Sequence, residues 1–317
     1  MTYTLQTFTG ADSSESYDSR YKARIHRYQA LEDIPWADLA QTKEERIRLL
    51  VGVPGKPLHL DALFIPRESP DLLVLSHGAL NQERVTLPFF QLVYSMVPNR
   101  SESLLFIFDT TMLVDRRIFT SYYLGVPEQD LVADYADLIT SMRMALRYQR
   151  VILAGHSAGG VASLMIGSKI EDSLAIASNP YIFDEHFVLP HLEDYRKAAF
   201  SAVASAREMV DAYSDRFYMR CRIEQRADRS QFFWYVHKDD DSWAKHGTVK
   251  RLAHSLGMDP YKPIDLKADN LLLVNWDYPG NPHNMPFDGE NYTFLPLIDI
   301  ALGKPSSFDL KAIGSCA

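Results

Sequence analysis

The sequence predicts an α/β protein with a mostly parallel sheet, and three observations lead to this fold class. Short, continuously apolar segments alternate with segments of helical character, as in parallel sheets that are covered on both faces. One such strand runs directly into Gly-His-Ser-Ala-Gly at residues 155–159, and a helical segment follows. The 317 residues, 46% hydrophobic and 23% charged, suit one large domain with a sizeable core.

The predicted elements justify this class in chain order. Residues 1–45 are expected to form an N-terminal arm or extension, of which residues 1–20 are polar. Two strands, 46–53 and 58–65, are joined by a Pro-Gly-Lys-Pro loop that favours a hairpin. The later apolar segments predict strands over 72–76, 104–108, 151–154, 174–177, 232–236 and 271–276, and helical spacing predicts helices over 82–96, interrupted at Pro88, and over about 127–148.

The strand pattern stops between residues 181 and 231, a stretch of helical character with many charges and aromatic rings. A connection of this length is uncommon in a compact domain unless it is functional. We therefore expect residues 181–231 to form a helical cap or lid, inserted between two parts of the core, 46–180 and 232–317.

The bulk composition excludes several classes of protein. A formal net charge of −8 without a strongly basic tract argues against nucleic-acid binding. The two cysteines, Cys221 and Cys316, are far apart and predict neither a disulfide framework nor a zinc site. No signal peptide is visible in the first 20 residues, and no apolar run is long enough to cross a bilayer. We expect a cytoplasmic protein, and the oligomeric state stays open.

Ser157 is the candidate nucleophile, because G-x-S-x-G between a strand and a helix is the pattern of a nucleophile elbow. The turn is crowded, and Gly155 and Gly159 leave no side chain to collide with the neighbouring strand and helix. The elbow also directs the backbone N–H of Ala158 to the place where an oxyanion would form.

A serine hydroxyl needs a base, and a third group must hold that base in the right tautomer. His283 is the best placed of ten histidines, since it lies in a Gly/Pro loop after the last predicted strand. His246 and His254 are weaker candidates. His156, inside the elbow, and His77 are expected to support turns.

Two further loops complete the expected site. The acid should follow the strand that ends at Val236, where the chain offers Asp239, Asp240 and Asp241. A second oxyanion donor is expected in the loop after the third core strand, where Gly78 permits a close approach. Ala79 is the expected donor there, with Leu80 as the alternative.

From about residue 46 to the C-terminus these motifs resemble the α/β-hydrolase superfamily. The resemblance implies a three-layer fold with an eight-stranded, mostly parallel sheet, and neither a metal nor a cofactor. It also implies a Ser157–Asp241–His283 triad, because in many relatives the acid lies five residues after the last apolar position of its strand. Asp240 ranks second and Asp239 third. The chain departs from many relatives at His237-Lys238, where they have His-Gly.

A narrower set of motifs is similar to hydrolase-fold proteins that accompany bacterial glycosyltransferases in surface-polysaccharide clusters. These motifs lie at residues 106–113, 122–125, 155–160 and 178–180. The similarity implies an ester of a sugar polymer or its precursor as substrate, and the aromatic loop 119–123 suits stacking on sugar rings.

The leading functional prediction is a serine esterase or deacylase that acts through an acyl-Ser157 intermediate on a small-molecule or carbohydrate ester. An O-acyltransferase would use the same residues with a sugar hydroxyl in place of water. A non-catalytic assembly partner that keeps the fold is the third possibility. The intact Ser, His and acid argue against this third class.

Overall fold

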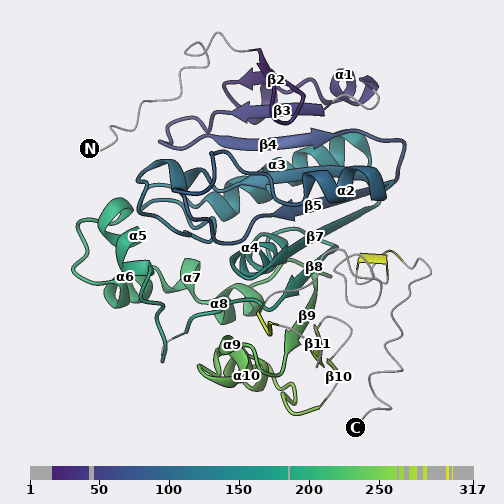
Figure 1. The fold of residues 1–317 in the computed structure, drawn as a ribbon. Coiled ribbons are helices and arrows are strands. Elements are labelled where there is room, and N and C mark those ends of the chain that lie inside the picture. The colour runs from purple at the N-terminus through teal and green to yellow at the C-terminus, as the bar shows by residue number, and fades with distance from the viewer. Residues whose placement is uncertain are drawn as a thin grey trace.

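The computed structural model describes residues 16–42, 46–184, 186–262, 264–267, 271–276, 281–283, 298–299 and 302. Its strands are β1 (Tyr17–Asp18), β2 (Ala23–Tyr28), β3 (Arg46–Val51), β4 (Leu60–Ile65), β5 (Asp71–Ser76), β6 (Ser103–Phe108), β7 (Arg150–His156), β8 (Ser173–Ser178), β9 (Gln231–His237), β10 (Ile264–Lys267) and β11 (Leu271–Trp276). They form one twisted sheet in the order β1-β2-β3-β4-β6-β5-β7-β8-β9-β11-β10 (Figure 1).

The sheet is mixed and mostly parallel. Within the described residues, six neighbouring pairs are parallel, and they include the whole central run from β6 to β11. The four antiparallel pairs are β1–β2, β3–β4, β4–β6 and β10–β11. The predicted number of eight strands is therefore wrong, because both edges of the core sheet carry additional strands. The predicted hairpin at residues 46–65 is present as β3 and β4.

The described part of the N-terminal segment adds strands β1 and β2 to this sheet. Strand β2 pairs in parallel with β3 along its whole length. Trp36, in helix α1 (Trp36–Gln41), is buried, and its Nε1 donates to Ser141 Oγ at 3.1 Å. Residues 1–15 of the expected arm, and Cys316, lie outside the described residues.

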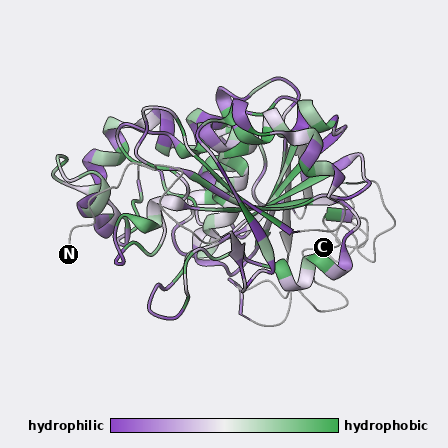
Figure 2. Ribbon diagram, turned by 90° about the horizontal axis from the view of Figure 1, so that it is seen from above, coloured by the Kyte–Doolittle hydropathy of each residue, from purple (hydrophilic) through white to green (hydrophobic). Residues whose placement is uncertain are grey.

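Helices cover both sides of the apolar strands, as Figure 2 shows. Besides α1, the α-helices are α2 (Val93–Asn99), α3 (Leu131–Leu146), α4 (Ala158–Gly167), α5 (Leu192–Ala199), α6 (Ala206–Ala212), α7 (Ser214–Phe217), α8 (Met219–Glu224), α9 (Asp241–Ala244) and α10 (Thr248–Ser255). Helix α4 packs on β5, β7, β8 and β9, and also against α3 and α8. Each residue of α4 is buried, and apart from Ser163 all of its residues are apolar.

The predicted helix over 82–96 is wrong over residues 82–92, since α2 begins only at Val93. Pro88 lacks the N–H that an α-helix requires and disfavours helical geometry in the residue before it. The side chain of Gln82 is also used elsewhere: its Nε2 lies within hydrogen-bonding distance of the carbonyl oxygens of Met112, Asp115 and Ile118. Residues 81–92 form a loop above the sheet instead.

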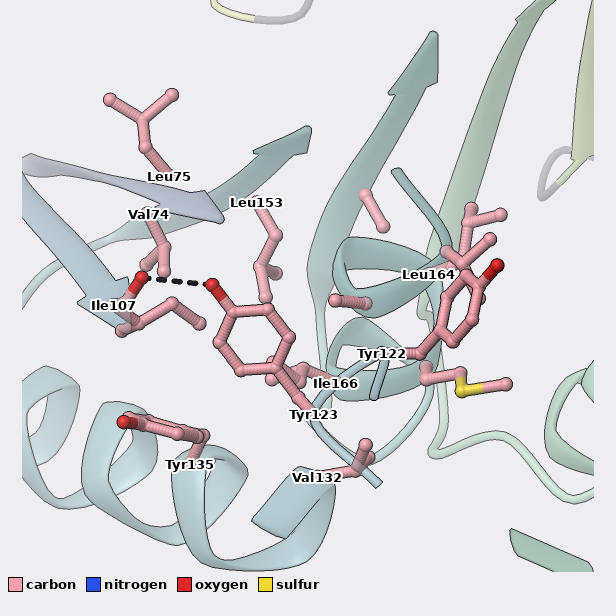
Figure 3. Packing of buried hydrophobic residues seen from close by; sticks show 14 of the residues in the cluster. Val74, Leu75, Ile107, Tyr122, Tyr123, Val132, Tyr135, Leu153, Leu164 and Ile166 are labelled. Carbon is pink, nitrogen blue, oxygen red and sulfur yellow. Dashed lines mark hydrogen bonds between the residues drawn. The ribbon is translucent and has the colours of Figure 1, made fainter. Parts of the chain in front are cut away.

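Two tyrosine hydroxyls form hydrogen bonds with the carboxyl ends of the central strands (Figure 3). Tyr123 points into the core, where its hydroxyl donates to the Ile107 carbonyl at 2.9 Å and accepts from the His77 N–H at 3.1 Å. The Tyr135 hydroxyl on α3 lies 2.5 Å from the Phe108 carbonyl oxygen. The ends of β5 and β6 are therefore held at fixed positions, and the loops that follow them start from a rigid base.

The segment 181–231 contains α5 to α8 and is anchored on residues 124–130. The Tyr195 hydroxyl donates to the Gly125 carbonyl at 2.6 Å. The buried Arg216 guanidinium donates to the carbonyls of Leu124, Val126 and Gln129. In Figure 1, α5 to α7 lie at the side of the molecule that also carries the loops after β5 and β6. Across the described residues, no helix combines the length and apolarity needed to cross a membrane.

Candidate active site

Ser157 occupies the turn between β7 and α4 with a strained backbone. Its φ is 55° and its ψ is −122°, a combination that residues other than glycine rarely adopt. A Cβ at Gly155 would lie 2.2 Å from the Gly159 carbonyl oxygen, and a Cβ at Gly159 would lie 2.6 Å from the Ser76 carbonyl oxygen. Both glycines are therefore required by close backbone approaches, and the strand–turn–helix geometry agrees with the sequence pattern.

His283 lies between Ser157 and a buried carboxylate. Its Nε2 is 3.0 Å from Ser157 Oγ, and its Nδ1 is 2.7 Å from Asp240 Oδ2. The imidazole is partly exposed, with 36% of its side-chain surface accessible, whereas the Asp240 side chain is 0% exposed. With the Nδ1 proton directed to Asp240, Nε2 is free to accept the proton of the serine hydroxyl.

The acid that contacts His283 is Asp240. The residue expected from the resemblance, Asp241, is its immediate neighbour in the chain. Asp240 caps the N-terminus of α9, and its Oδ1 accepts the Ser242 N–H at 2.9 Å and the Ser242 hydroxyl. An Asp at the N-cap satisfies free N–H groups of the first turn. Because Oδ1 caps the helix, Oδ2 is the oxygen that meets His283 Nδ1.

The neighbouring carboxylates point elsewhere. Asp241 is the first residue of α9, its side chain is 55% exposed, and it pairs with Lys245 Nζ at 3.6 Å. Asp239 is exposed, and its backbone N–H donates to His237 Nδ1 at 3.0 Å. Neither side chain is placed to orient His283.

Of the two candidate oxyanion donors in the loop after β5, one has a backbone N–H that is already bonded. The Leu80 N–H, the alternative oxyanion donor, is bonded to the Phe119 carbonyl at 2.9 Å. The Gly78 N–H donates to Gln91 Oε1 at 2.8 Å. Among the described contacts of this loop, the N–H of Ala79 has no such partner. Ala79 is therefore the better candidate of the two.

His77 determines the direction of the Ala79 N–H. The His77 side chain donates from Nδ1 to the Gly78 carbonyl at 2.7 Å and accepts the Asp109 N–H at Nε2, at 3.0 Å. The Gly78 carbonyl and the Ala79 N–H belong to one planar trans peptide and point in opposite directions. Fixing the carbonyl therefore fixes the N–H. Burial lowers the pKa of His77, which keeps the ring in this neutral form.

The second candidate donor is the N–H of Ala158, in the first turn of α4, where helical N–H groups have no partner within the helix. We call residues 77–80, which follow β5, the oxyanion loop. The N–H groups of Ala79 and Ala158 can converge, because this loop passes close to the elbow. A Cβ at Gly78 would lie 4.0 Å from Ser157 Cβ and 3.4 Å from the His156 carbonyl oxygen.

The remaining histidines have supporting or distant positions. The His156 ring packs at 5.1 Å from the His283 ring centroid, and its Nδ1 lies 3.3 Å from Ser178 Oγ. Burial and the neighbouring His283 lower the pKa of His156 to about 4. His246 stacks on Phe187 at 3.9 Å, and His254 is exposed on α10. Of the candidate bases, His283 alone contacts Ser157 in the described structure.

Aromatic side chains border the site on two sides. The Tyr181 ring stands edge-on to His283 at 5.8 Å, so the segment 181–231 begins beside the candidate base. Phe119, whose carbonyl accepts from the oxyanion loop, is 44% exposed. Tyr122 and Tyr123 are buried, so the Phe119 ring is the one aromatic side chain that the loop 119–123 exposes.

Three residues of the site were missed by the sequence analysis: Gln91, Ser242 and Asn179. Each acts through a polar side chain that reaches another segment or an adjacent turn. Apart from the N-cap pattern at 240–242, the sequence carries no signal for them. Within the described residues, no cluster of three His, Cys, Asp or Glu side chains is arranged to hold a metal ion.

No protein-family model and no curated protein sequence matches the chain. Among solved structures, the Gap123 glycosylation-associated protein complex from Streptococcus agalactiae is 17% identical over 70% of this chain and 41% of that chain, with a TM-score of 0.49. The chain thus spans less than half the length of that protein. LpqC, a poly(3-hydroxybutyrate) depolymerase from Bordetella parapertussis, is 12% identical over 90% and 99% of the two chains, with a TM-score of 0.47.

An acetyl xylan esterase from Aspergillus awamori is 11% identical over 71% of this chain and 89% of that chain, with a TM-score of 0.41. The identities and TM-scores of these three neighbours are all low. The function is therefore inferred from the geometry of the site alone.

Proposed function

We propose that this protein is a serine hydrolase of the carboxylesterase or deacylase type, which acts through an acyl-Ser157 intermediate. One observation carries the proposal: Ser157 Oγ, the His283 ring and the Asp240 carboxylate form a continuous hydrogen-bonded series at 3.0 Å and 2.7 Å. Activated serine nucleophiles are recognised by this geometry and by the roles of the three groups. A non-catalytic protein would have no need to hold Ser157 in a strained turn beside such a base.

Each step of the proposed reaction follows from this arrangement. Ser157 Oγ attacks the ester carbonyl carbon while its proton passes to His283 Nε2, and Asp240 stabilises the resulting imidazolium. The carbonyl oxygen becomes an oxyanion that accepts hydrogen bonds from the N–H groups of Ala79 and Ala158. The C–O bond to the alcohol breaks as the alcohol takes the proton from His283. Water then attacks the acyl-serine by the same route and releases the acid and free Ser157.

For the substrate class we propose an ester of a carbohydrate. The backbone of Phe119 is bonded to the oxyanion loop at Leu80, its side chain is exposed, and an exposed aromatic ring can stack on a sugar that carries the acyl group. We also propose that the segment 181–231 acts as a cap, because Tyr181, at its start, contacts His283. Truncating the Phe119 side chain should then weaken binding of acetylated sugars more than binding of small aryl esters.

The alternative is an O-acyltransferase, which the same exposed ring would support by holding a sugar acceptor in place of water. A well-oriented acceptor can outcompete water, because effective molarities reach on the order of 10⁵ M or more. Purified protein is given an activated acetyl donor with and without oligosaccharides. Fast acetate release that is indifferent to the sugar supports the hydrolase, whereas acetyl transfer that requires the sugar supports the transferase.

The proposal is tested at Ser157. A fluorophosphonate probe should label the wild type at this residue, and Ser157→Ala should abolish labelling and lower ester turnover by on the order of 10⁶-fold. Ser255→Ala, at an exposed serine on α10, is the matched control and should keep both properties. Labelling that survives Ser157→Ala, or turnover that does not change, would reject this function.

A further inference from the structure

A single buried amide side chain joins the segments that carry the proposed nucleophile, acid and base. Asn179 follows the last residue of β8, is 0% exposed, and has a φ of 41°. It lies at the carboxyl edge of the sheet, between β7, which leads to Ser157, and β9, which leads to Asp240. This placement is unusual for an amide, because a buried polar side chain costs free energy unless its hydrogen bonds are satisfied.

The described contacts of Asn179 use both halves of the amide. Its Oδ1 accepts the His237 N–H at 2.7 Å. Its Nδ2 lies 3.0 Å from the Pro282 carbonyl oxygen and 3.2 Å from the His283 carbonyl oxygen. The Asn179 backbone N–H also donates to the Tyr235 carbonyl at 2.8 Å. One side chain therefore bridges the end of β9 and the loop of the candidate base.

The proposed nucleophile, Ser157, is hydrogen-bonded to the residue next to Asn179. The Ser157 N–H donates to the carbonyl of Ser178, the residue immediately before Asn179, at 2.9 Å. His237, bonded to Asn179 Oδ1, lies three residues before Asp240, and its carbonyl accepts the Asp240 N–H at 3.0 Å. Residues 178 and 179 thus contact the backbone of all three segments that supply the proposed triad.

The chemistry of these contacts selects asparagine. Two carbonyl oxygens need a donor group with two hydrogens, and the His237 N–H needs an acceptor on the same short side chain. Aspartate offers only acceptors when ionised, and leucine offers neither. We infer that Asn179 is a positioning residue that sets His283 against both Ser157 and Asp240. The inference rests on the proposed hydrolase function, and Asn179 itself touches neither substrate nor the reacting atoms.

The test compares two substitutions with a matched control. Asn179→Asp keeps the acceptor for His237 and replaces the donor, and Asn179→Ala removes both. Asn99→Asp makes the same change at an exposed asparagine whose Nδ2 contacts the Ser95 carbonyl within α2. Misplacing a catalytic group by about 1 Å can cost about 100-fold in rate. Both Asn179 variants should therefore lower kcat and the rate of fluorophosphonate labelling by about that factor, with little change in KM, and Asn99→Asp should match the wild type.

A double-mutant cycle separates positioning from general stabilisation. If Asn179 acts through His283, then Asn179→Ala in a His283→Ala background should cost less than about 3-fold in residual turnover, because residues that act as a unit are not additive. The downfield proton resonance of the hydrogen bond between His283 and Asp240 should also weaken in Asn179→Asp. All rates are measured below the melting temperature of each variant.

Two outcomes would overturn the inference. The first is labelling of folded Asn179→Asp at the wild-type rate, even if its melting temperature is lower. The second is an equal loss in the wild-type and His283→Ala backgrounds, which would mean that Asn179 does not act through the histidine. A failure of the proposed function is distinguishable from both, because the wild-type protein would then show no labelling at Ser157.

Discussion

The two halves of the candidate site are built in different ways. The half that holds Ser157 and the oxyanion loop consists of the ends of two adjacent parallel strands, β5 and β7, and the N-terminus of α4. The turn at Ser157 is imposed by the backbone, through Gly155 and Gly159, which permit contacts at which any Cβ would collide. The side chains of His77 and Gln91 add hydrogen bonds to the adjacent oxyanion loop. The half that holds His283 and Asp240 consists of two loops whose positions depend on side chains: Asn179, and Ser242 beside Asp240.

This difference indicates where each half is sensitive to substitution. A backbone-built half fails when a side chain is added, whereas a half assembled by side chains fails when a polar atom is removed or changes from donor to acceptor. Isosteric changes of single polar groups should therefore lower kcat strongly in the half that holds Asp240 and His283. Such changes should lower kcat less around the oxyanion loop.

The largest expected effect separates the two adjacent aspartates. Asp240→Asn should lower kcat by on the order of 10⁴-fold, because an amide no longer favours the imidazole tautomer that can accept the serine proton. Asp241→Asn should leave kcat nearly unchanged, since that carboxylate is exposed and pairs with Lys245. Steady-state ester hydrolysis measures both. Comparable losses in the two variants, or a greater loss in Asp241→Asn, would contradict the register seen here.

An intermediate effect is expected at Gln91, which holds the Gly78 N–H in the oxyanion half. Gln91→Ala leaves this N–H without its partner and loosens the peptide that carries the Ala79 N–H. Loss of an oxyanion donor costs about 10² to 10³ in rate, so loosening one should cost about 10-fold in kcat with KM nearly constant.

Gln225→Ala, at an exposed residue after α8, is the control for Gln91→Ala. It should keep wild-type kcat. If Gln91→Ala reduced kcat as severely as Asp240→Asn, the proposed contrast between the two halves would not hold.

The smallest effect on turnover is expected at His156, whose ring packs against the His283 ring and so joins the two halves. Burial, and then the nearby His283, depress its pKa from 6.5 to about 4, so between these pH values the unfolded chain binds a proton that the folded chain does not. The stability contributed by neutral His156 is present above pH 6.5 and is lost as the pH falls toward 4. The loss is up to about 2 kcal/mol between pH 6.5 and 5.

Urea unfolding of the wild type and of His156→Gln at pH 7 and pH 5 measures how much the unfolding free energy changes between these pH values. The variant should lose less unfolding free energy over that interval than the wild type, and His254→Gln, at an exposed histidine on α10, should behave as the wild type. Identical pH dependence in the wild type and His156→Gln would show that His156 is not held neutral by the fold.

The central strands, the elbow and the candidate base could be predicted from local patterns in the sequence. Apolar runs locate β5 to β9 because these strands are buried on both faces, and such burial leaves a continuous pattern. Ser157 was identifiable because its conformation is set by neighbours within a few residues, Gly155 and Gly159, which the local sequence records. The loop that contains His283 was identifiable because it follows a clear strand.

Three features could be read only from the folded chain. They are which aspartate meets His283, which of the two candidate N–H donors after β5 is already bonded, and how the N-terminal strands extend the sheet. These outcomes depend on contacts between residues that are distant in sequence. His283 and Asp240 are 43 residues apart, and His283 and Ser157 are 126 apart. A shift of one residue along a loop turns a side chain from the site to solvent without changing composition or periodicity. The register is therefore fixed by hydrogen bonds across segments, such as those of Asn179, and these leave no local pattern in the sequence.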